Sequence, residues 1–565
     1  MPKTQKLLDE VTIRFAGDSG DGMQLSGTQF SNTSGTIGND VNTFPDYPSE
    51  IRAPEGTLYG VSAYQIQFGA KKVHTPGNQI DVLVAMNASS LKVNLPKVKK
   101  GGIIVTNTAG FDNRNLKLAQ YDENPLKDGS LDDYQLFAVD ISSLVQDELK
   151  DSGMKPKNIT RTKNMFALGL VYWLFDRPLE PTIKWLSEKF AKKEDILNAN
   201  LKTLQAGYNY GLTRDEFAVK YIIKGAELEP GIYRNITGNN AVAIGLVAAA
   251  KQANLPLFLG SYPITPATEI LHFISGYKKH GVKHLQAEDE IAGICSAIGA
   301  SYGGYLAATT TSGPGLSLKV EAIGLAIILE LPLVIVDVQR GGPSTGLPTK
   351  PEQSDLLMAM YGRHGEAPLP IISANSASDC FEKTIEAARI ALKYMTPVIL
   401  LTDGYLAQGT NPWKLPNIED LPDISVKFTN DKEGFAPYKR DPETLARLWA
   451  IPGTQGLEHR IGGLEKEDIT GLVSQDPKNH EKMVEIRAKK IANIENDIPL
   501  AEIQGEQQGD LLILSWGSTY GAIQDAYDKL TAEGKVLSYC HLNHLNPFPK
   551  NLGEILKRFK RILVP

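Results

Sequence analysis

The sequence predicts a multidomain α/β protein built on parallel, wound sheets. Two observations lead to this prediction. Short apolar runs typical of buried strands alternate with stretches of helical periodicity, often with a glycine-rich turn between them. The chain also has 565 residues, more than one hydrophobic core usually organises, so several such sheets are expected.

The first α/β unit is predicted over residues 1–220. It opens with an apolar strand at 11–17, followed by a glycine-rich turn and a helix. Further strands are expected at 80–86 and 101–107, and a strongly helical region runs from about residue 161 to 210. Strands separated by helices in this way are typical of parallel pairing within one sheet.

The second α/β unit is predicted over residues 225–412. Its expected elements are a helix at 239–253, a strand at 257–266, a helix at 291–304, a strand at 305–315, a helix at 316–330 and strands at 331–342 and 396–404. Residues 413–508 are polar and are interpreted as a connecting region with one helix near 480–497. A third unit is predicted over 509–565, where the closing RILVP indicates a strand.

Composition and charge argue against several classes of protein. The net charge of −6 gives no reason to expect a nucleic-acid partner. The N-terminal residues lack the apolar segment of a signal peptide, so a cytoplasmic location is predicted. The longest apolar run, at 322–338, is not expected to cross a membrane, because glycine, proline and acidic residues interrupt it.

The cysteines and histidines do not suggest a metal site. Cys295, Cys380 and Cys540 are widely spaced and form no CxxC pair, so neither a disulfide framework nor an iron–sulfur cluster is expected on this chain. His541 and His544 lie three residues apart, but two imidazoles alone would make a poor metal site.

The stretch GDSGDGMQ at 17–24 is predicted to be a turn between a strand and a helix. Its glycine spacing differs from the GxGxxG of dinucleotide-binding proteins. The free amides of such a turn could bind a phosphate-bearing ligand, and a purely structural turn explains the pattern equally well.

Thr265, in GSYPITPATE, is predicted to be a helix N-cap with Pro266 at the first helical position. The preceding apolar strand would place this turn at the carboxyl edge of a parallel sheet, where ligands bind. A helix N-terminus there favours a carboxylate ligand, although the threonine could serve only to cap the helix.

Three acidic residues, Glu288, Asp289 and Glu290, come just before a helix rich in small residues. Acidic residues in a first helical turn often only stabilise the helix dipole. The small residues nevertheless indicate that a cofactor, a sheet or a partner subunit packs close to this helix.

A second polar cluster forms where two more strands end. Thr309–Ser312 close one strand ahead of two glycines, and Arg340 follows the next strand directly. The residues Thr309–Ser312 and Arg340 are expected at the same edge of the sheet as Thr265. Glycines let a ligand approach the backbone, and an arginine can clamp a carboxylate with two hydrogen bonds.

Together YPITPATE, EDEIAG, TTTSGPG and RGGPSTGLPT resemble the α subunit of 2-oxoacid:ferredoxin oxidoreductases. The N-terminal stretch with AGDSGDGMQLSG resembles the γ subunit of the same enzymes, fused ahead of α as in the 2-oxoglutarate enzymes. The resemblance implies a γ-type domain, a pyrimidine-binding-type domain and a transketolase C-terminal-like domain. Members of the family usually continue past a strand like RILVP, which suggests a shortened chain.

The resemblance implies an enzyme that uses thiamine diphosphate to decarboxylate a 2-oxoacid oxidatively. Coenzyme A takes the acyl group and ferredoxin takes the electrons. A separate β subunit would share the thiamine diphosphate and carry Mg²⁺ and a [4Fe-4S] cluster, and an (αβ)₂ assembly is expected. The implied substrate is 2-oxoglutarate, with pyruvate or a branched-chain 2-oxoacid as the alternative.

The resemblance also implies roles for individual residues. Glu290, with Glu288 as the alternative, would exchange a proton with the aminopyrimidine of the cofactor. Cofactor contacts are expected from Thr311, Ser312 and Gly313, substrate contacts from Thr265, Arg340, Thr349, Arg363 and His364, and coenzyme A contacts from Gly17, Ser19, Gly20 and Gly22. His459 and Arg460 are further candidates for holding the second carboxylate of 2-oxoglutarate.

Two hypotheses that assign the chain to another class of protein stay open at this point. A non-redox thiamine enzyme of transketolase type would share the cofactor and would have a partner without cluster cysteines. A catalytically silent scaffold would depend on its partner and would show no turnover.

Overall fold

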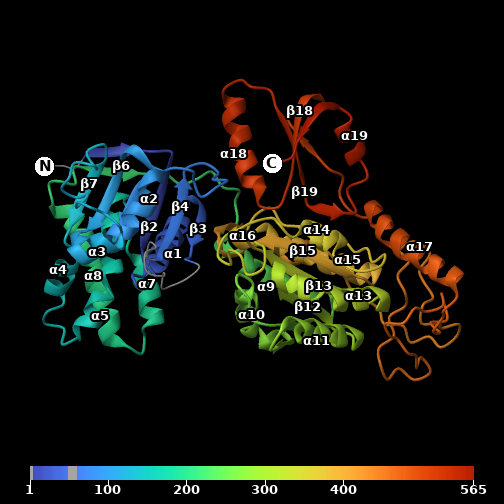
Figure 1. The fold of residues 1–565 in the computed structure, drawn as a ribbon. Helices are drawn as coiled ribbons and strands as arrows, with labels where there is room; N and C mark the ends of the chain where they lie inside the picture. Colours follow the sequence, from blue (N-terminus) through green and yellow to red (C-terminus); the bar gives the residue numbers. More distant parts are fainter. Residues whose placement is uncertain (1–3, 49–59) are drawn as a thin grey trace. The chain divides into compact units, whose positions relative to one another are not determined.

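A computed structural model describes residues 4–48 and 60–565 of the chain (Figure 1). The chain divides into two compact units, one formed by residues 1–235 with 410–415 and the other by 236–409 with 416–565. The finer division into four segments stays a prediction. None of the helices in the described residues has the length and apolarity needed to cross a bilayer.

The first unit is built on a six-stranded sheet with the strand order β3-β4-β2-β5-β6-β7. Its strands are β2 (Glu10–Asp18), β3 (Asp40–Asp46), β4 (Val61–Gly69), β5 (Ile80–Ala85), β6 (Val98–Asn107) and β7 (Gln135–Val139). Strands β2, β5, β6 and β7 are parallel, as expected, whereas β4 runs antiparallel to both of its neighbours. The α/β class is therefore confirmed, but this sheet is mixed rather than wholly parallel.

Helices cover both faces of this sheet. They are α1 (Met23–Thr36), α2 (Ala88–Asn94), α3 (Asn113–Leu118), α4 (Ile141–Glu148), α5 (Pro156–Thr160), α6 (Lys163–Leu174), α7 (Glu180–Lys189) and α8 (Glu194–Thr213). Helix α6 is buried on nearly all sides and crosses α8 closely. A Cβ at Gly169 would lie 2.0 Å from the Leu204 carbonyl oxygen, so glycine is what lets the two helix backbones touch. Short strands β1 (Thr4–Leu7) and β8 (Val219–Ile222) pair in parallel, and β9 (Tyr233–Thr237) pairs with β16 (Thr410–Lys414).

The second unit is built on a seven-stranded sheet with the strand order β11-β10-β12-β13-β15-β14-β20. Its strands are β10 (Leu257–Ser261), β11 (Val282–Gln286), β12 (Leu306–Thr311), β13 (Leu333–Gln339), β14 (Ile371–Ser373), β15 (Pro397–Asp403) and β20 (His544–Asn546). The first six are parallel, and β20 joins the edge antiparallel to β14. The wound parallel sheet expected here is confirmed, with one added strand from the C-terminal region.

Helices surround this sheet as well (Figure 1). They are α9 (Gly238–Ala253), α10 (Thr268–Ser275), α11 (Glu290–Tyr302), α12 (Gly313–Leu318), α13 (Val320–Leu329), α14 (Leu356–Tyr361), α15 (Asp379–Tyr394) and α16 (Gly404–Gln408). Helices α9 and α15 pack against each other. Helices α11 and α13 share a core with the sheet that extends to residues of the C-terminal region such as Leu512 and Leu542.

The C-terminal region has its own four-stranded sheet, ordered β17-β19-β18-β21. Its elements are β17 (Ile503–Gln504), β18 (Gly509–Trp516), α18 (Thr519–Ala532), β19 (Ser538–Leu542), α19 (Leu552–Leu556) and β21 (Phe559–Leu563). The strand expected at RILVP is confirmed as part of β21. The connecting region contains the expected helix as α17 (Pro477–Asn493).

A buried charge network ties the connecting region to the end of α13. The Glu330 carboxylate forms ion pairs with Arg440 and Lys490, and Arg440 also pairs with Asp468 at 2.5 Å. Burial raises the pKa of Glu330, but the positive charges of Lys490 and Arg440 lower it by more than burial raises it. The pKa of Glu330 therefore lies below its ordinary value. These contacts fix a segment that has little regular secondary structure.

Candidate active site

The candidate site lies where three neighbouring parallel strands end. Strands β10, β12 and β13 are adjacent in the sheet, so the loops that follow them meet at one edge. Thr311 is the last residue of β12, and the loops after β10 and β13 carry Thr265 and Arg340. The expectation that these polar clusters converge at one edge is confirmed.

Glu290 is the first residue of α11 and is half-buried, whereas Glu288 and Asp289 are exposed. Asp289 is the N-cap, and its side chain accepts a hydrogen bond from the Ala292 amide at 2.8 Å. The helix-stabilising role considered for the acidic cluster therefore belongs to Asp289. The Glu290 side chain lies beside Gly315, at the start of α12.

Tyr262 and Thr311 meet Glu290 around Gly315. The Tyr262 and Thr311 hydroxyls are 3.1 Å apart, and both side chains are buried. A Cβ at Gly315 would lie 2.0 Å from the Tyr262 hydroxyl, 2.3 Å from Thr311 Oγ1 and 2.9 Å from Glu290 Cγ. Burial raises the pKa of Tyr262, the Thr311 hydroxyl lowers it, and the Glu290 carboxylate raises it again. The phenol therefore keeps its proton beside the carboxylate.

Arg340 lies directly after β13 and is 8% exposed. Its Nη1 donates a hydrogen bond to the Thr265 carbonyl oxygen at 2.7 Å, and its Nε is buried without a partner in the described residues. Burial lowers the pKa of this guanidinium, and Tyr262 and Asp355 act in the opposite direction. A buried, incompletely paired guanidinium is suited to binding an anion.

Thr265 is not a helix N-cap, so that prediction is wrong. Helix α10 begins three residues later, its N-cap is Ala267, and the Thr265–Pro266 peptide bond is cis. The Thr265 side chain is exposed at the sheet edge, and its carbonyl oxygen is held by Arg340.

Ser312 and Gly313 continue the same wall after β12. Ser312 is fully buried, and its Oγ has no partner in the described part of the chain. Gly313 packs against Asp355, because a Cβ there would lie 2.6 Å from Asp355 Oδ1. Burial raises the pKa of Asp355 to about 6, and burial together with Asp355 raises the pKa of the fully buried Asp337. The two carboxyl groups therefore resist simultaneous ionisation beneath this wall.

The other predicted substrate residues lie on the loops that follow Arg340. Thr349 is half-buried in a loop that folds back, where the Gly341 amide donates to the Lys350 carbonyl oxygen at 2.9 Å. Arg363 donates from each of its three nitrogens to carbonyl oxygens of Ala359, Met360 and Ala367, and burial lowers its pKa to about 10. His364 beside it is exposed.

His459 and Arg460 lie in the connecting region. The His459 ring packs against Tyr302 and Phe435, and its Nδ1 is 2.8 Å from the Leu457 carbonyl oxygen. Its Nε2 is buried without a partner in the described residues, and Arg460 is exposed. Nothing in these contacts links either side chain to Arg340.

The turn predicted for coenzyme A lies in the first unit, between β2 and α1. Gly17 is the next-to-last residue of β2, Ser19 and Gly20 lie in the turn, and Gly22 adopts a left-handed conformation with φ 76° as the N-cap of α1. Two carboxylates lie at the turn: Asp18, the last residue of β2, accepts a hydrogen bond from Asn87 at 2.8 Å, and Asp21 pairs with Lys163 at 3.0 Å. The turn is therefore less favourable to phosphate than its glycines suggest.

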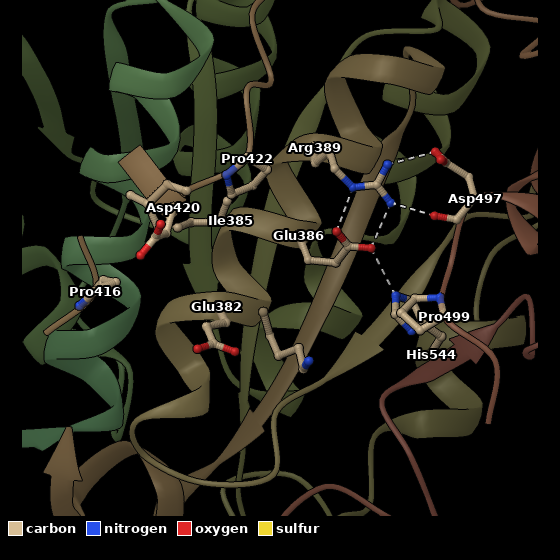
Figure 2. Close-up of a pocket in the computed structure, with 12 residues that line it drawn as sticks. Glu382, Ile385, Glu386, Arg389, Pro416, Asp420, Pro422, Asp497, Pro499 and His544 are labelled. Carbon is tan, nitrogen blue, oxygen red and sulfur yellow. Dashed lines mark hydrogen bonds and ion pairs between the residues drawn. The ribbon is translucent and has the colours of Figure 1, made fainter. Parts of the chain in front are cut away.

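A pocket of about 560 Å³ lies elsewhere in the second unit (Figure 2). Figure 2 shows Arg389 between the Glu386 carboxylate, bound at 2.7 and 2.9 Å, and Asp497, bound at 2.8 Å. His544 Nε2 lies 3.2 Å from the same Glu386. None of the predicted site residues lines this pocket. The contacts among Arg389, Glu386, Asp497 and His544 hold β20 and the segment around Asp497 against α15.

Comparison with known proteins places the chain in a family. A model described as Pyruvate ferredoxin/flavodoxin oxidoreductase matches residues 12–210, and one described as Pyruvate flavodoxin/ferredoxin oxidoreductase, thiamine diP-bdg, matches residues 248–476. The 2-oxoglutarate oxidoreductase subunit KorA of Mycobacterium tuberculosis is 50% identical over 100% of this chain and 86% of its own length. The chain belongs to the 2-oxoacid:ferredoxin oxidoreductase family. The family predicted from the sequence motifs is thereby confirmed.

A further relative and a solved structure carry 2-oxoglutarate in their names. The 2-oxoglutarate synthase subunit KorA of Methanothermobacter marburgensis is 32% identical over 58% of this chain and 86% of its own length. A structure of the 2-oxoglutarate:ferredoxin oxidoreductase from Magnetococcus marinus superposes with a TM-score of 0.85 at 32% identity, covering 99% of this chain and 92% of that one. That structure contains 2-oxoglutarate, coenzyme A and succinyl-CoA.

Tyr262, Lys319 and the Asp337–Asp355 pair lie at this site although the sequence patterns described above do not predict them. Tyr262 stands directly after a buried strand, where a large aromatic residue among small ones is a usable signal. Lys319 is a single charge at the break between α12 and α13, a stretch expected to be one continuous helix. The carboxyl pair joins residues from a strand and a later loop, so no local pattern reveals it.

Proposed function

We propose that this chain is the γ–α subunit of a 2-oxoglutarate:ferredoxin oxidoreductase. With a β subunit it would convert 2-oxoglutarate and coenzyme A to succinyl-CoA and CO₂ and pass the electrons to ferredoxin. The observation that carries the proposal is the convergence of Glu290, Thr265 and Arg340 at one sheet edge. The relatives named for 2-oxoglutarate support the choice of substrate.

The residues around Gly315 fit thiamine diphosphate. The missing side chain at Gly315 lets the Tyr262 and Thr311 hydroxyls come together beside Glu290, and the unpaired Ser312 Oγ offers a polar contact in the same wall. When bound, thiamine diphosphate supplies a nucleophilic carbon and an electron sink. Thr311, Ser312 and Gly313 would line its face, and a β subunit would share it and hold Mg²⁺ and a [4Fe-4S] cluster.

Glu290 would exchange a proton with the N1′ atom of the cofactor's aminopyrimidine. Tyr262 and Thr311 hold each other at 3.1 Å beside this carboxylate and limit its movement. A general acid–base group must be held within hydrogen-bonding reach of its proton partner. We therefore assign Glu290 the proton transfer, and Tyr262 and Thr311 the task of orienting it.

Arg340 would clamp the reacting carboxylate of the oxoacid. Its contact with the Thr265 carbonyl oxygen fixes the guanidinium, and its unpaired Nε stays available for an acceptor. The Thr265 and Thr349 hydroxyls would bind the keto and carboxylate oxygens. For the second carboxylate, four donors were predicted, including His459 and Arg460 in the connecting region. Of Arg363 and His364, His364 is the freer, because every nitrogen of Arg363 already donates a hydrogen bond.

Coenzyme A contacts at Gly17, Ser19, Gly20 and Gly22 remain part of the proposal. Because Asp18 and Asp21 lie in the same turn, we expect it to receive an uncharged part of coenzyme A rather than its phosphates. The (αβ)₂ assembly, the ferredoxin partner and the cytoplasmic location stay predictions.

The test is an anaerobic assay of the chain co-purified with its cluster-bearing partner. Dye reduction would be followed with coenzyme A and each of 2-oxoglutarate, pyruvate, 2-oxobutyrate and a branched-chain 2-oxoacid. Coenzyme A-dependent reduction with 2-oxoglutarate alone would support the proposal. A preference for another acid would overturn the substrate assignment, and no reduction with any acid would indicate the non-redox class.

Glu290 is tested in the same complex with a matched control. Glu290→Gln should abolish turnover and leave assembly intact, because the amide cannot exchange the proton. Glu288→Gln, two residues away and exposed, should keep normal turnover. Normal activity in the Glu290 variant together with loss in the Glu288 variant would reassign the proton transfer to Glu288.

A further inference from the structure

A buried lysine lies beneath the start of α11. Lys319 stands between α12 and α13 and is fully buried. Its Nζ donates hydrogen bonds to the Glu290 carbonyl oxygen at 2.8 Å and to Thr309 Oγ1 at 3.2 Å. The same ammonium lies 5.1 Å from the centroid of the Tyr262 ring. One side chain therefore contacts a helix, a strand and a loop of the candidate active site.

Folding alone does not explain a charge at this position. Among the described residues no carboxylate lies within the 4.0 Å of an ion pair with Lys319 Nζ. The direct contacts of the ammonium are two neutral acceptors and an aromatic ring, and the carboxylates of Glu290 and Asp289 act on it from farther away. A methionine has a similar length and flexibility, and apolar replacements of buried charges are often neutral or stabilising. Stability therefore does not explain why a charged residue occupies position 319, and the candidate catalytic residue that Lys319 contacts is Glu290.

We propose that Lys319 is a positioning residue for Glu290, which fixes the first residue of α11 and supplies a positive charge beneath the carboxylate. The inference rests on the proposed function and adds to it a residue that touches neither cofactor nor substrate. By holding the Glu290 carbonyl oxygen, Lys319 sets where the helix begins. The direction of the Glu290 side chain follows from that position.

The charge on Lys319 is sensitive to pH in the neutral range. Burial lowers its pKa to about 8, against the opposing effects of Glu290, Cys295 and Asp289 on α11. The other charged or titratable groups around this cluster are Tyr262 after β10 and Glu321 on α13. Turnover should therefore decline as the pH rises through about 8, when the ammonium loses its proton.

The test uses Lys319→Met and Lys319→Gln in the complete complex. Both substitutions remove the positive charge. Glutamine keeps a hydrogen-bond donor, on a side chain shorter than that of lysine. We expect kcat to fall about 10- to 100-fold, the KM for 2-oxoglutarate to change by less than about twofold, and the decline near pH 8 to disappear. Lys319→Arg, which keeps a charge, should recover part of the lost turnover.

Lys466→Met is the matched control. Lys466 is also buried, donates to a backbone carbonyl oxygen (that of Leu464, at 2.7 Å), faces the ring of Tyr438 and has a pKa lowered to about 8. It should keep the parental kcat and pH profile. Thermal unfolding of each variant and calorimetric titration with thiamine diphosphate would accompany the kinetics.

Three results would overturn the inference. They are a parental kcat and pH profile in the Lys319 variants, an equal loss of kcat in Lys466→Met, or a parent enzyme without a decline in turnover near pH 8. The last measurement needs no variant, so a Lys319 variant that fails to fold leaves the inference open to refutation. Absence of turnover in the parent with every 2-oxoacid would instead refute the proposed function.

Discussion

A methyl group added at Gly315 would enter the space between three side chains of the candidate active site. In the parent the Cβ of an alanine would lie 2.0 Å from the Tyr262 hydroxyl and 2.3 Å from Thr311 Oγ1. Real Cβ contacts shorter than 3.0 Å essentially do not occur, so the neighbours must move by about 1 Å. Tyr262 and Thr311 are both buried, which leaves them little room to do so.

The expected magnitude follows from that displacement. A misplacement of about 1 Å in a catalytic constellation costs about 100-fold in rate, so kcat of Gly315→Ala should fall by about two orders of magnitude. Forcing one extra methyl group into a packed region should lower the free energy of unfolding by about 1–3 kcal/mol. The KM for coenzyme A should stay unchanged, because the substitution does not touch that predicted site.

The assay is 2-oxoglutarate-dependent dye reduction by the complex, with thermal unfolding of the same preparations. Gly299→Ala on α11 and Gly324→Ala on α13 are the controls, because a Cβ at either position meets nothing within 4 Å. Both should keep parental kcat and equal or greater stability, since alanine favours a helix by about 1 kcal/mol. Parental kcat in Gly315→Ala would refute the reasoning that Tyr262, Thr311 and Glu290 must hold their observed positions.

Three other substitutions give further tests. Arg340→Ala should raise the KM for the oxoacid about 10- to 100-fold and leave that for coenzyme A unchanged, and equal effects on both would contradict a substrate clamp. Glu330→Gln should lower the free energy of unfolding, measured with urea, by about 3–5 kcal/mol, while exposed Glu433→Gln should change it little. Folding lowers the pKa of Glu330 from 4.5, so the contribution of its carboxylate to stability is present above that pH and is lost in acid. The free energies of unfolding of the parent and of Glu330→Gln should therefore become equal at acidic pH. Burial raises the pKa of Asp355 from 3.8 to about 6, so ionisation of this carboxyl group destabilises the fold at neutral pH. The Asp355→Asn variant should therefore have a higher melting temperature than the parent at pH 7, and the difference should vanish near pH 4. A difference in melting temperature that stays constant with pH would contradict this.

Much of the sheet edge could be predicted from the sequence. Buried parallel strands appear as continuous apolar runs, and the residues that end them stand out by their glycines and hydroxyl groups. Thr311 and Arg340 were identified on that basis, and both end or follow a strand of the same sheet. Strands β3 and β4 were missed, because polar residues such as Asn42 and Gln65 interrupt their apolar pattern.

Contacts between distant segments could not be predicted in this way. Helix α10 begins at Thr268 rather than at Pro266, while the Thr265 carbonyl oxygen accepts a hydrogen bond from Arg340 on a distant loop. Lys319 stands at the break between α12 and α13, and its ammonium reaches Glu290 and Thr309, both on other elements. The placement of Gly315 against Tyr262 likewise depends on two loops meeting, which no local periodicity encodes.

The antiparallel edge strand of the second unit has a consequence for how the chain is made. Strand β14 pairs with β20, which is synthesised well after β14 and after the connecting region, so the seven-stranded sheet is incomplete until then. On the ribosome β14 would present open backbone donors and acceptors, the kind of edge that recruits other chains. We expect nascent chains released before residue 546 to engage chaperones and to aggregate, because their last edge strand is missing.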